Sequence, residues 1–320
     1  HTLYLSPEAE AAERDGFEGE IQGIGVEVSE DNGNIVVMSP IDGSPAAAAG
    51  LMPGDILREA NGEVLTGLTV TEAAQIVRGP RGTEVTLLIE RDGETFEVVV
   101  ERDVITIASV RGEMLDNNLA YVRLSRFGDQ SDEEMKTILT ELMAENPDGL
   151  ILDLRRNPGG GLDTVVEIAD EFLPQGVVLF EQFSDGVKRE FDSRAGGLAE
   201  EIPMVVLIDE GSASASEVLA GAIRDRGRGV LIGNISFGKG TVQTWQRLSN
   251  GGGLRLTIAR WLTPDDTWVH HEGLTPDYYV LLPEFDPDVE FEDTQLEAAV
   301  DFLLGQPVIE SPQPEAVEET

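Results

Sequence analysis

Two short segments carry residue types that can perform covalent chemistry together. Ser214 lies among small residues in the segment 211–217, and Lys239 lies in a loop between two glycines. The chain has only three lysines against 19 arginines, so a lysine at this place is unusual. Arginine stays protonated, whereas a buried lysine can lose its proton and act as a base. The pair therefore predicts a serine nucleophile and a lysine general base, the chemistry of a serine–lysine protease.

Each of these two residues has an ordinary explanation when it is considered alone. Small residues around Ser214 often only cap a helix, and Lys239 could be a loop lysine that faces water. A free lysine has a pKa near 10.4, so a general base at this position must be desolvated. Phe237 is expected to form part of an apolar wall beside it. Only the combination of the two segments favours catalysis.

A glycine-rich loop at 157–161 is the third element of the candidate site. Successive glycines expose backbone N–H groups that can line an anion site. A tetrahedral intermediate needs about two such donors. We expect one from Gly160 and one from Ala215, which directly follows the serine. Taken alone, the loop would be an ordinary strand-to-helix turn.

The histidines do not indicate another hydrolytic mechanism. The chain has only His1, His270 and His271, and adjacent residues on an extended chain face opposite ways. A Ser-His-Asp triad is therefore not expected, and no Gly-x-Ser-x-Gly elbow occurs. No convincing set of metal ligands accompanies the histidine pair, and the absence of cysteine excludes thiol catalysis and disulfides. We predict no metal and no cofactor.

The main alternative interpretation of the segment around Lys239 is a nucleotide-binding loop. Residues 233–240 are one residue short of a P-loop, and they follow a predicted strand. However, Gly240 occupies the position where serine or threonine would hold magnesium. The residues that follow, 241–245, have a strand pattern, whereas a P-loop opens a helix. Nucleotide binding is therefore not predicted.

The elements around these loops indicate a mixed α/β chain. We expect an N-terminal helical remnant at 1–20, a β-rich domain at 21–103, and an α/β core at 104–285. A last helix at 293–306 and an acidic tail, expected to be disordered from about Pro307, complete the segment 286–320. The core alternates strands with helices.

Within the β-rich domain, local signals mark several elements. Residues 35–38 form a strand, Ser44 caps a short helix, and Thr69 begins a helix that runs to about Arg78 with capping-box spacing. Two further strands at 84–90 and 94–101 are joined as a hairpin.

In the core, Ser131 and Glu134 have capping-box spacing ahead of a helix with one apolar face. The helix after Ser214 is expected to reach about Arg224. Three short apolar strands each lead into one of the candidate loops, and a hairpin follows the lysine loop. These strands and the hairpin are expected at 150–152, 204–208, 230–232, and 241–248 with 254–260.

The charge of the chain limits its partners. It has 61 acidic and 22 basic side chains, a formal net charge of −39. Nucleic acid and anionic membranes would repel such a surface. A salt-rich habitat and simple solubility both explain this excess. No apolar run is long enough to cross a bilayer, and the start at His1 suggests that a preceding segment was removed.

Three motifs together resemble the signatures of the C-terminal processing (tail-specific) serine peptidases. They are Leu-Asp-Leu-Arg-x-Asn-Pro-Gly-Gly at 152–160, Gly-Ser-Ala-Ser-Ala-Ser-Glu at 211–217 and Phe-Gly-Lys-Gly-Thr-Val-Gln at 237–243. They occur in the family's order and spacing, and the resemblance covers nearly the whole chain.

This resemblance implies a role for each matching residue. Ser214 matches the nucleophile, Lys239 the general base, and Gln243 the residue that orients the lysine. The backbone amides of Ala215 and of Gly160 or Gly159 match the oxyanion hole.

Residues 21–103 resemble a PDZ domain. The segment Gly23-Ile24-Gly25-Val26 looks like its carboxylate-binding loop, and the helix at 69–78 would form one wall of the peptide groove. In such a groove, a free C-terminus adds to the sheet as a strand. The resemblance also suggests that Arg78 couples peptide binding to the active site; the plain alternative is a surface cation.

The resulting hypothesis is an endopeptidase that cleaves unstructured proteins near their free C-termini and is gated by its PDZ domain. The resemblance implies an extracytoplasmic location (periplasmic, cell-surface or secreted), with a membrane anchor or a homo-oligomer through the missing N-terminal region as further options. The alternative is a catalytically silent, peptide-binding scaffold.

Overall fold

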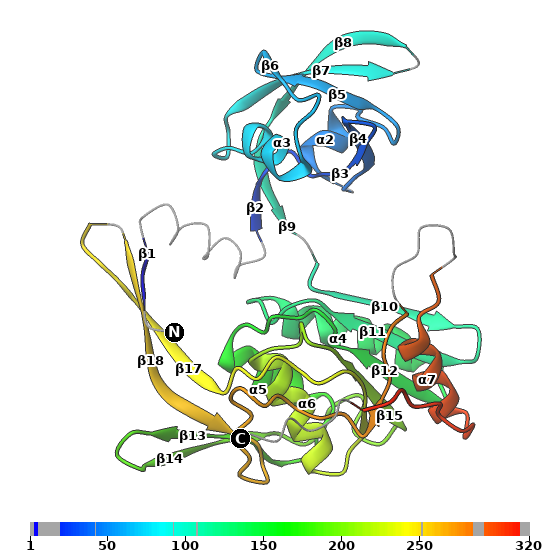
Figure 1. Cartoon of the computed structure of the whole chain (residues 1–320), viewed down its shortest axis with the longest axis vertical. Coiled ribbons are helices and arrows are strands. Elements are labelled where there is room, and N and C mark those ends of the chain that lie inside the picture. The colour runs from blue at the N-terminus through cyan, green and yellow to red at the C-terminus, as the bar shows by residue number, and fades with distance from the viewer. Residues whose placement is uncertain are drawn as a thin grey trace. The chain divides into compact units, whose positions relative to one another are not determined.

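The computed structural model describes residues 3–5, 20–41, 43–91, 93–106, 108–250, 252–283 and 291–313 (Figure 1). The chain divides into two compact units. The smaller unit is Gly19–Ile107, and the larger one combines Ala108–Thr320 with His1–Glu18. The predicted mixed α/β class, with a β-rich domain ahead of an α/β core, is confirmed.

The smaller unit is built on an antiparallel sheet with the strand order β3-β4-β5-β7-β8, and β6 pairs with β5. A separate two-stranded sheet joins β2 to β9. The strand bounds are β2 Glu20–Gly23, β3 Val26–Asp31, β4 Asn34–Pro40, β5 Ile56–Ala60, β6 Glu63–Val64, β7 Glu84–Arg91, β8 Glu94–Glu101 and β9 Asp103–Thr106.

Two helices cover the core of this unit, and both begin where the sequence predicts. Helix α2 spans Pro45–Ala48, and Ser44 caps it by accepting a hydrogen bond from the Ala47 N–H. Helix α3 spans Val70–Val77 and begins with a capping box between Thr69 and Glu72. The predicted β-hairpin strands are also present, although Asp92 at their turn lies outside the described residues.

The larger unit is organised around a sheet with the strand order β10-β11-β12-β15-β16-β19. Strand β10 is antiparallel to β11, and the remaining pairs are parallel. The strand bounds are β10 Val110–Leu115, β11 Leu119–Leu124, β12 Gly149–Asp153, β15 Met204–Ile208, β16 Val230–Gly233 and β19 Tyr278–Tyr279. The three apolar strands expected from the sequence are therefore the sheet's central neighbours β12, β15 and β16.

Helices cover both faces of this sheet because successive side chains of a buried strand point to opposite faces. Leu150 and Leu152 pack with α4, α5 and α6, whereas Ile151 packs with α7 on the other face. The helix bounds are α4 Ser131–Ala144, α5 Leu162–Asp170, α6 Ala215–Asp225 and α7 Thr294–Leu303.

A second sheet in the larger unit has the strand order β1-β18-β13-β14, and β17 pairs with β18. The strand bounds are β1 Leu3–Leu5, β13 Gly176–Phe183, β14 Lys188–Ser193, β17 Thr241–Arg247 and β18 Gly253–Leu262. The hairpin expected after the lysine loop is β17 with β18 (Figure 1).

Two local predictions differ from the structure. Residues 3–5, expected to belong to an N-terminal helical remnant, form strand β1 because they pair with β18, and β2 begins at Glu20. The rest of the predicted helical segment, residues 6–19, lies outside the described residues. Ser131 and Glu134 do not form the predicted capping box of α4. The Ser131 hydroxyl instead accepts a hydrogen bond from the Gly128 N–H. The Glu134 carboxylate accepts from the backbone N–H groups of residues 109 and 110.

The C-terminal prediction also needs a correction. Helix α7 packs on the central sheet and is therefore part of the core. The expected disorder does not begin at 307, since Ser311 donates its N–H to the Tyr279 carbonyl and accepts from the Leu281 N–H. Residues 314–320, also expected to be disordered, lie outside the described chain.

A buried ion network anchors the end of β12, where the glycine loop begins. Arg155 donates to Asp153 and, at 2.7 and 2.9 Å, to both carboxylate oxygens of Asp293, the N-cap of α7. Burial alone would raise the pKa of Asp153, but the hydrogen bonds and charge of Arg155 outweigh it and hold that pKa below its usual value. Burial and the Asp153 charge raise the pKa of Tyr121, which donates to Asp153, to about 12. The network fixes helix α7 to the strand that leads into the site.

Candidate active site

The three candidate loops meet at one edge of the central sheet. Strands β12, β15 and β16 are parallel neighbours, so their carboxyl ends lie at the same edge. The glycine loop follows β12, the serine turn follows β15, and the lysine loop follows β16. Ligand sites of open α/β sheets lie at the carboxyl ends of the strands. The topology thus gathers the segments that the sequence singled out.

Ser214 occupies a strained turn directly before helix α6. Its backbone has φ +56° and ψ −114°, a conformation that residues with a side chain rarely adopt. Ala215 is the first residue of the helix, and within the described chain its N–H donates to no acceptor. Unpaired N–H groups at a helix N-terminus favour negative charge. The turn therefore presents the serine beside a donor suited to an oxyanion.

One buried carboxylate joins the serine turn to the lysine loop. Glu217 is fully buried, and its Oε2 accepts from the Ser214 N–H at 2.8 Å and from the Lys239 N–H at 2.9 Å. Its Oε1 accepts from the Gly238 N–H and the Ser236 hydroxyl, each at 2.6 Å. Hydrogen bonds to an ionised acceptor are stronger than neutral ones. Glu217 therefore fixes the backbone of the two candidate catalytic residues against one carboxylate.

Two tryptophans hold the peptide that follows Lys239. The Trp261 indole N–H donates to the Lys239 carbonyl at 2.9 Å, and the Trp268 indole N–H donates to the Gly240 carbonyl at 2.7 Å. Position 240 must be glycine, because a Cβ there would lie 2.7 Å from the Trp268 indole nitrogen. The backbone of the lysine is thus fixed on both sides, by Glu217 and by these indoles.

The side chain of Phe237 does not form the apolar wall that the sequence predicts beside Lys239. Its side chain is 61% exposed and so does not enclose the lysine. Its backbone N–H donates to the Ser212 carbonyl, which draws this part of the loop onto the serine turn. The buried aromatic side chain at this loop is instead Trp261, 2% exposed.

Gln243 lies on β17, four residues after the lysine. Strand β17 pairs with β18, and the register shifts between Val242 and Gln243 because Ile258 is an extra residue on β18. Bulges of this kind are common beside active sites. Because the extra residue is on β18, the alternation of side chains along β17 continues through Gln243.

The glycine loop is tied to the serine turn by Asn157. Its backbone carbonyl accepts from the Ala213 N–H and the Ser216 hydroxyl, and its side-chain oxygen accepts from the Gly159 N–H. The Gly159 amide is therefore already occupied. By contrast, the Gly160 N–H has no acceptor in the described residues.

Both glycines are required by close backbone contacts. A Cβ at position 159, where φ is +98°, would lie 2.8 Å from both the Ala215 nitrogen and the Ser214 Cβ. A Cβ at position 160 would lie 2.1 Å from the Phe127 carbonyl oxygen. The glycine loop thus packs directly against the serine turn, on the side of the Ala215 N–H.

Sequence reasoning missed the residues that hold the loops together. Glu217 has the spacing of a capping-box glutamate three residues after Ser214, which was a usable signal. Its bonds to the lysine loop could not be foreseen, because they join segments from two different strands. The same holds for Asn157 and for the two indoles.

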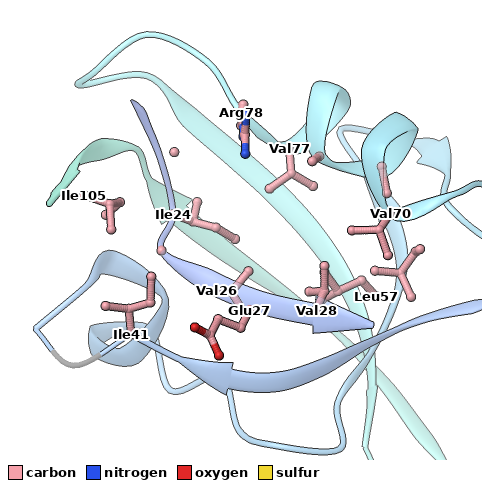
Figure 2. Close-up of a pocket in the computed structure, with 15 residues that line it drawn as sticks. Ile24, Val26, Glu27, Val28, Ile41, Leu57, Val70, Val77, Arg78 and Ile105 are labelled. Atoms are coloured by element: carbon pink, nitrogen blue, oxygen red, sulfur yellow. The ribbon is translucent and has the colours of Figure 1, made fainter. Parts of the chain in front are cut away.

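A second candidate site lies in the smaller unit, between strand β3 and helix α3 (Figure 2). It is an apolar groove of about 230 Å³ whose lining includes Ile24, Val26, Val77 and Arg78. All four residues of the predicted carboxylate-binding loop, 23–26, line it. In the described chain, the N–H groups of Ile24 and Gly25 donate to no other residue. An apolar groove with free N–H groups at one end suits an extended peptide with a C-terminal carboxylate.

Comparison with known families assigns both units. The profile of peptidase family S41 matches residues 118–280, and the profile of the PDZ domain matches residues 36–91. The chain belongs to peptidase family S41. It is therefore a serine peptidase by class, and the PDZ match accounts for the β-rich unit.

Individual proteins agree with this S41 assignment. The carboxy-terminal-processing protease of Bartonella bacilliformis is 39% identical over 88% of this chain and 67% of its own length. The carboxy-terminal processing protease CtpA of Bacillus subtilis is 33% identical over 89% of this chain and 61% of its own length. The solved photosystem II D1 C-terminal processing protease has a TM-score of 0.55 at 30% identity, covering 88% of this chain and 79% of that one. The chain thus spans about two thirds of the length of these curated relatives.

Proposed function

We propose that the chain is an endopeptidase that cleaves unstructured polypeptides near their C-termini with a Ser214–Lys239 dyad. In this mechanism the Lys239 amine takes the Ser214 hydroxyl proton as the oxygen attacks the peptide carbonyl. Gln243 orients the lysine. The ammonium then gives the proton to the departing amine, the C–N bond breaks, and an acyl-enzyme forms on Ser214. Water hydrolyses this ester, with Lys239 again acting as base.

The oxyanion hole in this proposal consists of the Ala215 and Gly160 N–H groups. Both lack an acceptor in the described residues, and the two segments pack against each other. Gly159 is left out as a donor because its N–H already binds Asn157. Two donors aimed at the developing negative charge are the usual requirement for acyl transfer.

The observation that carries the proposal is the Glu217 carboxylate, which binds the backbone N–H of both Ser214 and Lys239. It fixes the relative position of the two catalytic residues before substrate arrives, which is how preorganised sites lower a barrier.

Digestion of an unstructured protein tests the proposal. Casein, and an unfolded polypeptide that ends in apolar residues, are incubated with the chain, and the fragments are identified by mass spectrometry. We expect discrete fragments from both, at a higher rate for the second substrate. Peptide binding without any cleavage of either substrate would favour the catalytically silent scaffold.

We further propose that the PDZ groove binds the substrate C-terminus and gates activity, with Arg78 as the coupling residue. Arg78 follows α3 as its C-cap, and a Cβ at Gly23 would contact its Cγ at 3.6 Å. The cation therefore lies beside the loop that is proposed to hold a carboxylate. An extracytoplasmic location is part of the same proposal. None of the helices in the described ranges has the length and apolar content to span a bilayer.

Peptide binding tests the groove. A fluorescent peptide that ends in an apolar residue with a free carboxylate is expected to bind at least about tenfold more tightly than the same peptide with a C-terminal amide, because the amide loses charge-assisted hydrogen bonds. Fluorescence anisotropy gives both dissociation constants. A third peptide that ends in aspartate controls for apolar specificity and is expected to bind weakly. Equal affinity for acid and amide would contradict the assignment.

A further inference from the structure

Thr241 is the first residue of β17, and its buried hydroxyl forms no hydrogen bond in the described part of the chain. Its Oγ1 is inaccessible to water, yet it has no hydrogen-bond partner among the described residues. A hydroxyl in this state gives up its bonds to water without replacement, which is unfavourable for folding. Most buried polar groups in native proteins are paired, so an exception at an active site calls for a functional explanation.

The position of Thr241 relates it to the proposed base. The β17–β18 ladder continues one residue before Thr241, because the Trp261 N–H donates to the Gly240 carbonyl. The extra residue of the bulge is on β18, so the spacing along β17 is unbroken. Side chains of an extended chain alternate with a period of two. From this alternation we infer that residues 239, 241 and 243 are directed to one side, with Thr241 between the lysine and Gln243.

A protonated lysine has enough N–H donors to bind this hydroxyl as well as its other proposed partners. A neutral amine that takes the serine proton becomes an ammonium with three N–H donors. In the proposed mechanism the Ser214 oxygen and the Gln243 side-chain oxygen accept two of them. The third N–H can bind an acceptor on the same side of the strand.

We propose that the Thr241 hydroxyl is a further residue of the catalytic centre and accepts the third hydrogen bond of the Lys239 ammonium. This inference rests on the proposed Ser214–Lys239 mechanism. The bond forms when the lysine is protonated and its side chain turns toward the hydroxyl, which is kept available because it binds no other described residue. Interactions made only on the way to the transition state raise kcat rather than substrate affinity.

Replacement of Thr241 by valine tests this role, because valine has the same shape without the hydroxyl. We expect kcat for an apolar-ended peptide to fall about 10- to 100-fold, the loss of one hydrogen bond to a charged group, with KM changed less than about twofold. Thermal stability should stay equal or rise, since an unsatisfied buried group is removed. A drop in activity without a drop in stability separates catalysis from packing.

The pH profile gives an independent readout. The base works when deprotonated, so kcat/KM rises with pH through the pKa of the lysine. Loss of an acceptor destabilises the ammonium and lowers that pKa. The acid limb of the Thr241→Val profile is therefore expected at lower pH than that of the parent chain.

A second pair of variants covers the case in which valine disturbs the fold. Thr241→Ser and Thr241→Ala both lack the methyl group and differ only in the hydroxyl. We expect the serine variant to exceed the alanine variant at least about tenfold in kcat, close to the ratio of threonine to valine. Equal kcat within either folded pair would overturn the inference. If Ser214→Ala retains the parent's cleavage, the proposed function itself fails; if Ser214 is required but the hydroxyl is not, only this inference fails.

Discussion

Ser214→Ala and Lys239→Arg are each expected to lower kcat on an unstructured substrate by about 10³-fold or more, the scale seen when a member of a catalytic unit is removed. Alanine removes the nucleophile. Arginine keeps the positive charge and most of the length of lysine, but it does not lose its proton near neutral pH and cannot act as a base. Lys239→Arg therefore tests proton transfer separately from charge.

Two controls make this prediction specific. Lys188→Arg changes a lysine that lies on strand β14 and is ion-paired with Asp266, and it is expected to leave kcat unchanged. Binding of the C-terminal peptide to the PDZ groove should be the same in all these variants, since the groove lies in the other unit. Lys239→Arg with activity close to that of the parent chain would rule out the lysine as base.

Glu217→Gln is expected to have the second-largest effect, although Glu217 is not itself proposed to react. An amide has one oxygen, so it cannot accept from all four donors that bind the carboxylate. The Ser236 hydroxyl can reverse its bond, but at least one backbone N–H is left facing an NH₂ group. Each buried donor left unsatisfied costs about 1–3 kcal/mol. We therefore expect a lower free energy of unfolding and a fall in kcat of about 10²-fold, because the two loops lose their common anchor.

The control for this variant is Glu210→Gln. Glu210 is exposed at the same turn, and its carboxylate accepts only from the Asn234 side chain at 3.0 Å among the described residues. Its replacement is expected to leave stability and kcat almost unchanged. Urea unfolding and steady-state kinetics on both variants give the comparison. A Glu217→Gln chain with the parent's kcat would show that the buried carboxylate does not position the dyad.

Much of the fold was predictable because local chemistry and the buried strands agreed. The caps at Ser44 and Thr69, and the apolar runs that became β12, β15 and β16, are all signals within a few residues of chain. Since parallel neighbours end at one edge, the loops that follow these strands had to meet there.

The failures have a common physical cause. Residues 3–5 became a strand because β18 offers a pairing partner some 250 residues away in the sequence, and local composition carries no sign of it. Glu134 binds backbone groups at 109 and 110 instead of its own helix. In the site, the segments were predictable, but the contacts between them were not, because Glu217 and the two indoles act across elements that are distant in sequence.

The central claim, that Ser214 forms an acyl bond with the substrate, is tested most directly by trapping the intermediate. The chain is mixed with an apolar-ended peptide, quenched in acid within the first turnover, digested, and analysed by mass spectrometry. The account predicts that the peptide containing Ser214 gains the mass of the N-terminal part of the substrate, and that this adduct is absent from Ser214→Ala. Continued cleavage by Ser214→Ala, or an adduct on another residue, would contradict it.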